Sequence, residues 1–330
     1  MTETHPKYAG FDIIPTTFKQ VGEHAIRTDI LVPQKPHPGK RPVIVRFHGG
    51  GLLMGDSLFA GFWPHWLTDF ALLHNAIVIS PNYRLMPQAT GLELWSDIED
   101  FWTWLRSGAV ESLLSTHSTP TTPDLNRILL AGDSAGGLLS VNAGLAHAND
   151  VRAITALYPC LNPASPDFAE PRKELFPFNT RTPESTIREV LSSAPSGPIS
   201  SAVEPQYLPL MLAAIEYGRI GPWYTRGSVG EEAQERLDWL FPGRRLEKEG
   251  VKVPRGGITI IQGRQDSVVP AHHSEPFVKR AKEVFAGQAG GDKISLVFTD
   301  GEHGFDTDLR YHEEEWLRDA LKTAAEAWLA

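Results

Sequence analysis

The sequence predicts an α/β fold with a mostly parallel central sheet, helices on both faces of that sheet, and a helical cap. Short runs rich in Val and Ile recur along the chain, and segments with helical spacing separate them, which indicates the sheet and its helices. Residues 162–255 break this alternation, because they contain many prolines and show no strand pattern. With 330 residues, the chain is long enough for one large core together with an inserted cap.

The expected strands are apolar throughout, which is typical of parallel strands that are buried on both faces. These runs are 42–47, 76–80, 127–131, 153–157, 257–261 and 294–298. The segment 24–32 alternates more clearly, so we expect it to supply an antiparallel edge strand. Helical patterns are found at about 91–106, 135–147, 271–285 and 311–329.

These patterns divide the chain into three parts. Residues 1–40 form an N-terminal segment with the edge strand, and whether they contribute to the cap is left open. Residues 41–161 and 256–330 form the core. Residues 162–255 form the inserted helical cap, since so long a stretch is not a simple loop in a compact domain. An apolar helix is expected in the cap at about 204–217.

Composition limits the classes of partner. The net charge is -9 and no Lys/Arg cluster is present, which argues against nucleic acid or an anionic membrane and favours a small molecule. No apolar run approaches the roughly 20 residues of a spanning helix, and residues 1–8 do not resemble a secretory signal. Cys160 is the single cysteine and is expected to be a buried structural thiol. We therefore expect a cytoplasmic protein, either a monomer or a homodimer.

A candidate nucleophile lies where a strand meets a helix. Ser134 is flanked by Gly132 and Gly136, after the apolar run 127–131 and before the helix-prone stretch 137–143. Such a strand, turn and helix present a serine hydroxyl above a sheet, and the positive end of the helix points at the same place. Because short motifs also occur by chance, the assignment depends on the other motifs.

The sequence His-Gly-Gly-Gly at 48–51 directly follows the expected strand 42–47. Consecutive glycines there bring backbone amides close to one point, which suits an anion that forms during a reaction. The alternatives are a plain flexible loop and a phosphate site, although no GxxxxGK or GxGxxG pattern is present. His48 itself is expected to shape the loop rather than to take part in the chemistry.

Two ionisable residues follow other strands. Asp266 comes after 257–261 and His303 after 294–298, and loops gather at the carboxyl ends of parallel strands. A serine needs an imidazole to take its proton, and the imidazole needs an acid to fix its tautomer. Ser134, Asp266 and His303 occur in the order that this chemistry takes on the α/β-hydrolase scaffold. Taken alone, Asp266 could equally cap the first turn of the helix that follows it, and His303 could equally be a turn residue.

Two alternatives concern the neighbourhood of His303. Other carboxylates near it in sequence are Asp300, Glu302 and Asp306. They suit the role of the acid less well, because a side chain adjacent to the base along the chain rarely reaches its far nitrogen. His272 and His273 could be metal ligands together with His303, but this spacing matches no common zinc motif. No metal and no cofactor is predicted.

The chain resembles the hormone-sensitive lipase family of α/β-hydrolases, the esterase group marked by the motifs HGGG and GDSAG, from about residue 42 to the C-terminus. The resemblance implies that Ser134 is the nucleophile, Asp266 the acid and His303 the base. It implies that the amides of Gly50, Gly51 and Ala135 form the oxyanion hole.

Two further features refine the resemblance. Residues 82–87 resemble the family's Tyr-Arg-Leu-Pro element, and the following residues 88–97 replace its usual Glu-His-Pro-Phe run. That replacement is similar to fungal members of the group, some of which accompany natural-product pathways. The family also contains plant gibberellin receptors that have lost the catalytic histidine, so the presence of His303 argues against a receptor.

Candidate substrate-binding residues are the aromatic side chains that follow the glycine loop or lie in the cap, although such residues are as often simply core. The aromatic residues in these two places are Phe59, Phe62, Trp63 and Trp66 after the loop and Tyr207, Tyr217, Trp223 and Tyr224 in the cap. From these, Trp63, Trp66, Tyr207 and Trp223 are selected as the candidates. Asp133, the residue before the candidate nucleophile, is included with them, and it is expected to hydrogen-bond nearby backbone or the glycine loop.

The expected function is that of a serine hydrolase that cleaves a carboxylic ester or lactone of a small, largely apolar molecule through an acyl-enzyme intermediate. An alternative is that the same machinery performs acyl transfer, carbon–carbon cleavage or cyclisation in a fungal-type natural-product pathway. A third hypothesis is a non-catalytic protein that binds a ligand under the cap.

Overall fold

A computed structural model describes residues 5–117, 120–173, 181–228 and 235–330. Eight strands form one sheet in the order β1-β2-β4-β3-β5-β6-β7-β8. The strands are β1 (Phe11–Val21), β2 (His24–Pro33), β3 (Lys40–Phe47), β4 (Ile77–Pro81), β5 (Thr122–Asp133), β6 (Val151–Leu157), β7 (Ile258–Gly263) and β8 (Ser295–Thr299). Strands β3 to β8 pair in parallel, whereas β1 and β2 run antiparallel to their neighbours. The predicted fold class is confirmed.

The N-terminal edge of the sheet differs from the expectation. The segment predicted as the edge strand is β2, which is antiparallel as expected but lies between β4 and β1, so β1 forms the edge. Strand β1 contains Pro15 and is only partly buried, so it lacks the pattern by which strands are recognised. A proline is tolerated in an edge strand because one side of the strand has no partner.

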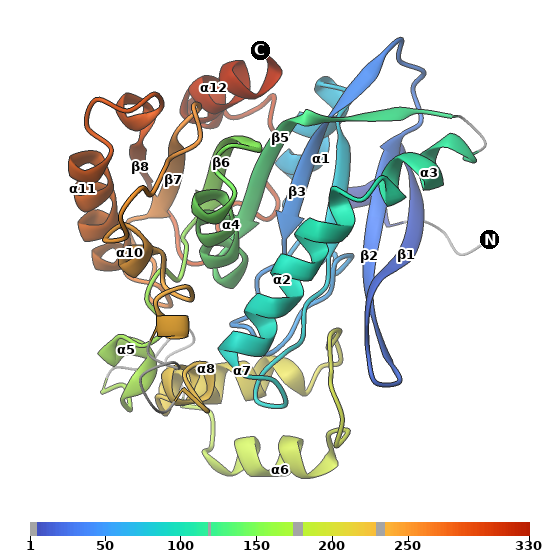
Figure 1. Ribbon diagram of the computed structural model, residues 1–330. Coiled ribbons are helices and arrows are strands. Elements are labelled where there is room, and N and C mark those ends of the chain that lie inside the picture. The colour runs from blue at the N-terminus through green and yellow to red at the C-terminus, as the bar shows by residue number, and fades with distance from the viewer. Residues whose placement is uncertain (1–4, 118–119, 174–180, 229–234) are drawn as a thin grey trace.

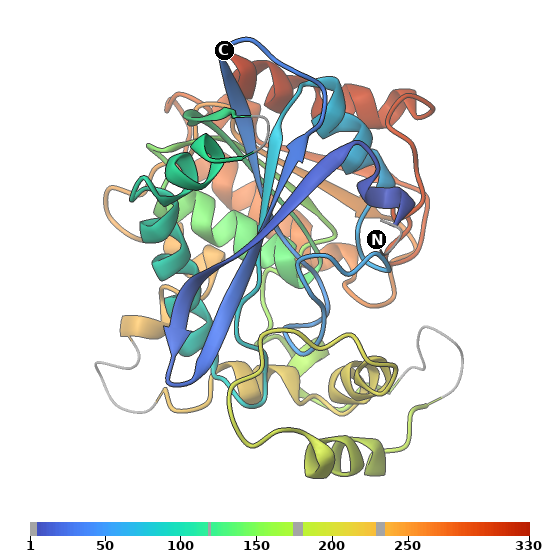
Figure 2. The ribbon, with the colours of Figure 1, turned by 90° about the vertical axis from the view of Figure 1, so that its right-hand side faces the viewer.

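Helices cover both faces of the sheet, as Figures 1 and 2 show. Alternate residues of β3 point to opposite faces, so Val43 and Val45 join one core and Ile44 joins the other. The first core packs against α2 (Gly91–Leu105), α4 (Ala135–Ala146) and α11 (Ser274–Val284). The second packs against α1 (His65–Leu73) and α12 (Glu315–Leu329).

Two helices of the core, α1 and α3 (Ala109–Ser115), were not among those expected from the sequence. Both are short and lack a side-chain cap at their first turn. By contrast, the expected helix α2 begins with a capping box, in which the Thr90 hydroxyl accepts from the Glu93 amide and the Glu93 carboxylate accepts from the Thr90 amide. Short 3-10 turns complete the core at η1 (Pro6–Tyr8), η2 (Ala271–His273) and η3 (Gly291–Lys293).

Between β6 and β7 the chain forms further helices, most of which lie together beyond one end of the strands, whereas α10 (Pro242–Arg245) packs against α4 (Figure 1). They are α5 (Pro166–Ala169), α6 (Ser185–Ser193), α7 (Tyr207–Glu216), α8 (Ile220–Tyr224) and α10. Helix α7 is the apolar helix expected at about 204–217. The limits 162–255 stay our prediction for the cap, and residues 174–180 and 229–234 of that range lie outside the described residues.

The N-terminal hairpin β1–β2 touches this helical segment. His24 Nε2 and Ser200 Oγ are 2.8 Å apart, and Figure 2 shows the hairpin extending toward the helices. Every described helix is either too short or too polar to cross a bilayer.

Candidate active site

Ser134 lies in the sharp turn that joins β5 to α4. Its backbone has φ 55° and ψ -117°, a region that residues other than glycine rarely adopt. Two neighbouring glycines make this turn possible, because a Cβ on Gly132 would lie 2.2 Å from the carbonyl oxygen of Gly136, and a Cβ on Gly136 would lie 2.0 Å from that of Phe47. The predicted strand, turn and helix therefore raise the serine above the sheet on a strained backbone.

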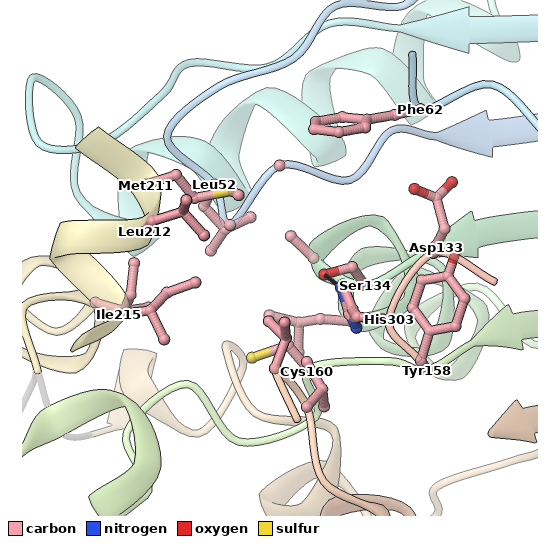
Figure 3. A pocket seen from close by; sticks show the side chains of 18 of the residues that line it. Leu52, Phe62, Asp133, Ser134, Tyr158, Cys160, Met211, Leu212, Ile215 and His303 are labelled. Atoms are coloured by element: carbon pink, nitrogen blue, oxygen red, sulfur yellow. Dashed lines mark hydrogen bonds between the residues drawn. The ribbon is translucent and has the colours of Figure 1, made fainter. Parts of the chain in front are cut away.

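A hydrogen-bonded chain connects three residues that are far apart in the sequence. Ser134 Oγ is 3.0 Å from His303 Nε2, and His303 Nδ1 is 2.9 Å from Asp266 Oδ2. Figure 3 shows the serine and imidazole next to each other at the pocket. Asp266 is held by the amides of Val268 and Val269, which donate to its Oδ1 at 3.0 and 2.8 Å. The structure thus brings together the three residues that sequence reasoning selected.

The competing carboxylates have other partners. Glu302 accepts hydrogen bonds from the amide and hydroxyl of Ser267 and from the His303 amide, so it shapes the turn rather than contacting the imidazole. Asp300 is exposed and contacts Gln265. Asp306 is fully buried and accepts from the Trp66 indole at 2.8 Å and from the Tyr158 hydroxyl.

The candidate oxyanion donors surround the serine. Gly50 and Gly51 line the same pocket as Ser134, and Ala135 is the first residue of α4, where the helix provides no acceptor for its amide. Gly50 has φ 108°, and a Cβ there would lie 2.2 Å from the Met54 carbonyl oxygen. The glycine at this position lets the loop fold back on itself beside the serine.

Asp133 and Arg46 form a buried ion pair beneath the glycine loop. Arg46 Nη2 donates to Asp133 Oδ1 at 2.9 Å, and the Gly49 amide donates to Asp133 Oδ2 at 3.1 Å. This is the contact with the glycine loop that was expected of Asp133. Burial raises the pKa of Asp133 to about 6, and the guanidinium of Arg46 counteracts part of that rise. The carboxylate therefore anchors the loop to the end of β5.

The histidine of the glycine motif is part of the loop's support. The His48 ring is fully buried and stacks on Tyr83 with 4.4 Å between centroids, and the Tyr83 hydroxyl donates to the His48 carbonyl oxygen at 2.6 Å. Burial lowers the pKa of His48 to about 4, so the ring is neutral near pH 7. A neutral, buried ring that stacks on Tyr83 is suited to shaping the loop.

Tyr158 was not singled out by the sequence. It follows β6 directly with φ 36°, its ring centroid lies 4.5 Å from that of His303, and its hydroxyl donates to buried Asp306. Burial raises the pKa of Tyr158 well above its ordinary value, so the phenol remains a donor. A position at the carboxyl end of a parallel strand is the only signal that could have indicated it.

The serine opens onto a cavity of about 440 Å³, a size typical of small-molecule sites. Most of its lining is apolar, and several of these residues are labelled in Figure 3. The apolar side chains are Leu52, Phe62, Ala135, Leu138, Pro163, Phe168, Leu208, Met211, Leu212, Ile215, Ile220, Val268 and Val269. Helix α7 supplies four of them, Leu208, Met211, Leu212 and Ile215, so the helical segment between β6 and β7 closes one side of the cavity.

Cys160 also lines the cavity. Burial raises the pKa of its thiol to about 12, so the thiol is protonated near pH 7 and is a poor nucleophile. It is buried as expected, and it contributes a small apolar surface beside the serine.

Among the aromatic residues named from the sequence, Phe62 lines the cavity, whereas the four candidates Trp63, Trp66, Tyr207 and Trp223 are not part of its lining. Trp66 belongs to α1 and Trp63 precedes that helix, and both are buried in the second core, where the Trp63 indole donates to Thr68 and the Trp66 indole to Asp306. Trp66 and Phe70 are four residues apart and share the helix face that packs on the sheet. Tyr207 and Trp223 pack against the first core. Of the five substrate-binding candidates, Asp133 alone lines the cavity.

Comparison with known proteins supports the hydrolase site that the geometry suggests. Residues 44–205 match a family described by the alpha/beta hydrolase fold. The "Probable carboxylesterase M8" of a Phoma species is 30% identical over 331 residues, which is 98% of this chain and 98% of that protein. The chain belongs to the α/β-hydrolase family.

One further relative and one solved structure also resemble this hydrolase. The "Probable carboxylesterase clz11" of Cochliobolus lunatus is 32% identical over 208 residues, 61% of this chain and 89% of that protein. The esterase Est2 of Thermogutta terrifontis superposes with a TM-score of 0.57 at 17% identity, covering 97% of this chain and 92% of that one. At that identity the superposition shows the fold alone. The expected similarity to fungal members is confirmed by the first two relatives.

Proposed function

We propose that this hydrolase cleaves carboxylic esters through an acyl-enzyme intermediate formed on Ser134. The observation that carries the proposal is the hydrogen-bonded chain of Ser134, His303 and Asp266 at one end of an apolar cavity. The relatives named as carboxylesterases support the class of reaction, since one of them matches nearly the whole chain.

In the first step the ester carbonyl lies beside Ser134, and His303 Nε2 takes the proton of the hydroxyl as it attacks. Asp266 holds the proton on Nδ1, so that Nε2 is free to accept, and stabilises the imidazolium that forms. The negative oxygen of the tetrahedral intermediate is held by the amides of Gly50, Gly51 and Ala135.

The intermediate collapses when His303 returns the proton to the leaving alcohol, which leaves the acyl group on Ser134. In the second step, water takes the place of the alcohol and gives its proton to the same Nε2. The acid is released and the serine regains its proton, so the enzyme returns to its starting state.

We propose a small and largely apolar substrate, and the lining of the cavity supports this proposal. Besides the serine and the histidine, the polar residues of this lining are Asp133, Tyr158, Glu302 and Thr307. Glu302 Oε2 already accepts three hydrogen bonds, and the Tyr158 hydroxyl is bound to Asp306. The apolar side chains of α7 on the cap and of Val268 and Val269 on the core would enclose an aliphatic or cyclic acyl group. Lactones of similar size fit the same description.

Steady-state kinetics on nitrophenyl esters of increasing acyl length test the proposal. Ser134→Ala should lower kcat by at least about 10⁴-fold, and the purified protein should react with a fluorophosphonate probe only when Ser134 is present. Met211→Trp should fill the cavity and lower kcat/KM for longer acyl groups more than for acetate, whereas Leu73→Trp, on an exposed residue of α1, should leave that ratio unchanged.

Product analysis in ¹⁸O-labelled water separates hydrolysis from the other reactions open to the same residues. Hydrolysis places solvent oxygen in the released acid, while transfer or cyclisation does not. An active Ser134→Ala variant would overturn the proposed acyl-enzyme intermediate. A folded wild-type protein that does not react with the fluorophosphonate probe would favour a binding role instead.

A further inference from the structure

A second cluster of ionisable side chains lies outside the active-site chain. Asp167, in α5, has its Oδ2 atom 2.7 Å from His272 Nε2 and 2.9 Å from His273 Nε2. The three side chains offer ligand atoms that all lie within 4.8 Å of one another. The two imidazoles are neighbours in η2 and stack with 4.8 Å between centroids. They therefore present both Nε2 atoms to one carboxylate of the cap.

We propose that Asp167, His272 and His273 bind one divalent transition-metal ion such as Zn²⁺. Two imidazoles and a carboxylate are ligands that Zn²⁺ takes at about 2.0–2.2 Å, and a tetrahedral ion with such bonds holds its ligand atoms about 3.3 Å apart. Asp167 Oδ2 lies 2.7 and 2.9 Å from the two Nε2 atoms, which are hydrogen-bond distances, so these side chains would move apart by about half an ångström to admit the ion. Each Nε2 gives its lone pair to the ion while the ring proton lies on Nδ1, and water completes the coordination.

Exposure suits such a site, because the His272 side chain is 63% exposed and an ion can enter from solvent.

The position of the cluster gives the ion a structural role. Asp167 belongs to the cap and is followed by Phe168, which lines the cavity, while the histidines end the loop that begins at Asp266. Arg172 of the cap already donates to the carbonyl oxygens of Ser267 and Val268 in that loop. The ion would fasten the cap to the loop that carries the active-site carboxylate, without touching the serine or its base.

Spacing in the sequence could not indicate this site. Asp167 lies 105 residues before His272. From the sequence we predict no metal, because only His272, His273 and His303 are considered as ligands and their spacing matches no common zinc motif. The fold instead turns His303 toward Ser134 and brings Asp167 to the histidine pair.

Isothermal titration of the full chain with ZnCl₂, after treatment with EDTA and dialysis, tests the proposal. We expect one Zn²⁺ per chain, and titration with Co²⁺ should produce a visible absorption band typical of imidazole coordination. The melting temperature should rise with added Zn²⁺, because the ion binds the folded state. Neither readout depends on esterase activity, so the result stands apart from the proposed function.

His272→Asn changes an exposed side chain and should leave the fold intact. Because loss of even an outer-shell partner weakens metal affinity about 10–100-fold, loss of a direct ligand should weaken it at least tenfold. Asp167→Asn, as a second variant, should do the same. His312→Asn is the matched control, since His312 is also exposed and lies 3.5 Å from a carboxylate, that of Asp69.

Two results would overturn the proposal. One is the absence of stoichiometric Zn²⁺ binding to the wild-type protein, which would leave the cluster as a hydrogen-bonded clamp between cap and core. The other is binding that persists unchanged in both His272→Asn and Asp167→Asn, which would place the ion elsewhere.

Discussion

The phenol ring of Tyr158 packs against the imidazole of His303, with 4.5 Å between centroids and 58° between planes. The far end of the phenol is tied to Asp306, a buried carboxylate that also accepts from the Trp66 indole. Tyr158 therefore forms a wall beside the base, and its hydroxyl keeps that wall in place. It lines the cavity and packs against the imidazole, and we regard it as a positioning residue because it acts on the base through this packing.

Tyr158→Phe keeps the ring and removes the hydroxyl. Asp306 then loses a donor in a fully buried site, which should lower the free energy of unfolding by about 1–3 kcal/mol. Urea denaturation measures this loss. Because the ring still supports His303, kcat should fall much less than in Tyr158→Ala, and equal losses of kcat in the two variants would contradict the positioning role.

Asp266→Asn places an amide where the carboxylate accepts from His303 Nδ1. The amide can donate to that nitrogen, which favours the tautomer with the proton on Nε2, and an imidazole in that form cannot take the serine proton. We expect kcat to fall about 10⁴-fold while KM changes little. Asp300→Asn is the control, because Asp300 is exposed near the same turn. Comparable losses in both variants would remove Asp266 from its assigned role.

Gly50→Ala adds a Cβ that would meet the Met54 carbonyl oxygen at 2.2 Å, on a backbone with φ 108°. The loop must move to accommodate it, so an oxyanion donor is lost and kcat should fall about 10²–10³-fold. Gly243→Ala is a suitable control, since a Cβ there meets nothing within 4 Å. Steady-state kinetics together with circular dichroism separate this effect from unfolding, and a Gly50→Ala enzyme with the wild-type kcat would refute it.

His48 should make the protein less stable in mild acid. Its pKa is about 4 in the folded protein and 6.5 when unperturbed, so between these values the unfolded chain binds a proton that the folded chain does not. The stabilisation that the neutral His48 ring provides is complete above pH 6.5 and is lost as the pH falls toward 4. At pH 5 this lowers the free energy of unfolding by about 2 kcal/mol.

Urea denaturation near pH 7 and near pH 5 measures this loss, and His48→Gln should show a smaller difference between the two conditions. Asp133 acts in the opposite direction, because its raised pKa of about 6 makes the folded state the better proton binder at mildly acidic pH. The comparison of wild type with His48→Gln isolates the histidine, and identical pH dependence in both would exclude it as the cause.

The central strands, the four main helices of the core and the three residues of the active-site chain could be read from the chain itself. Buried parallel strands are apolar along their whole length, and a nucleophile turn needs glycines at set positions, so both leave marks in a few consecutive residues. The order of Ser134, Asp266 and His303 then placed them at strand ends that must gather at one edge of the sheet.

Contacts between distant segments cannot be recognised from a few consecutive residues. Whether Trp66 faces the cavity or the core depends on a helix that packs on the sheet, and whether Asp167 meets His272 depends on where the cap settles. The edge strand β1 could not be recognised because a strand with one free side need not be apolar. Local sequence determines which reactive groups each segment carries. Packing between segments decides which side chains meet, because the free energy of packing depends on residues scattered along the chain.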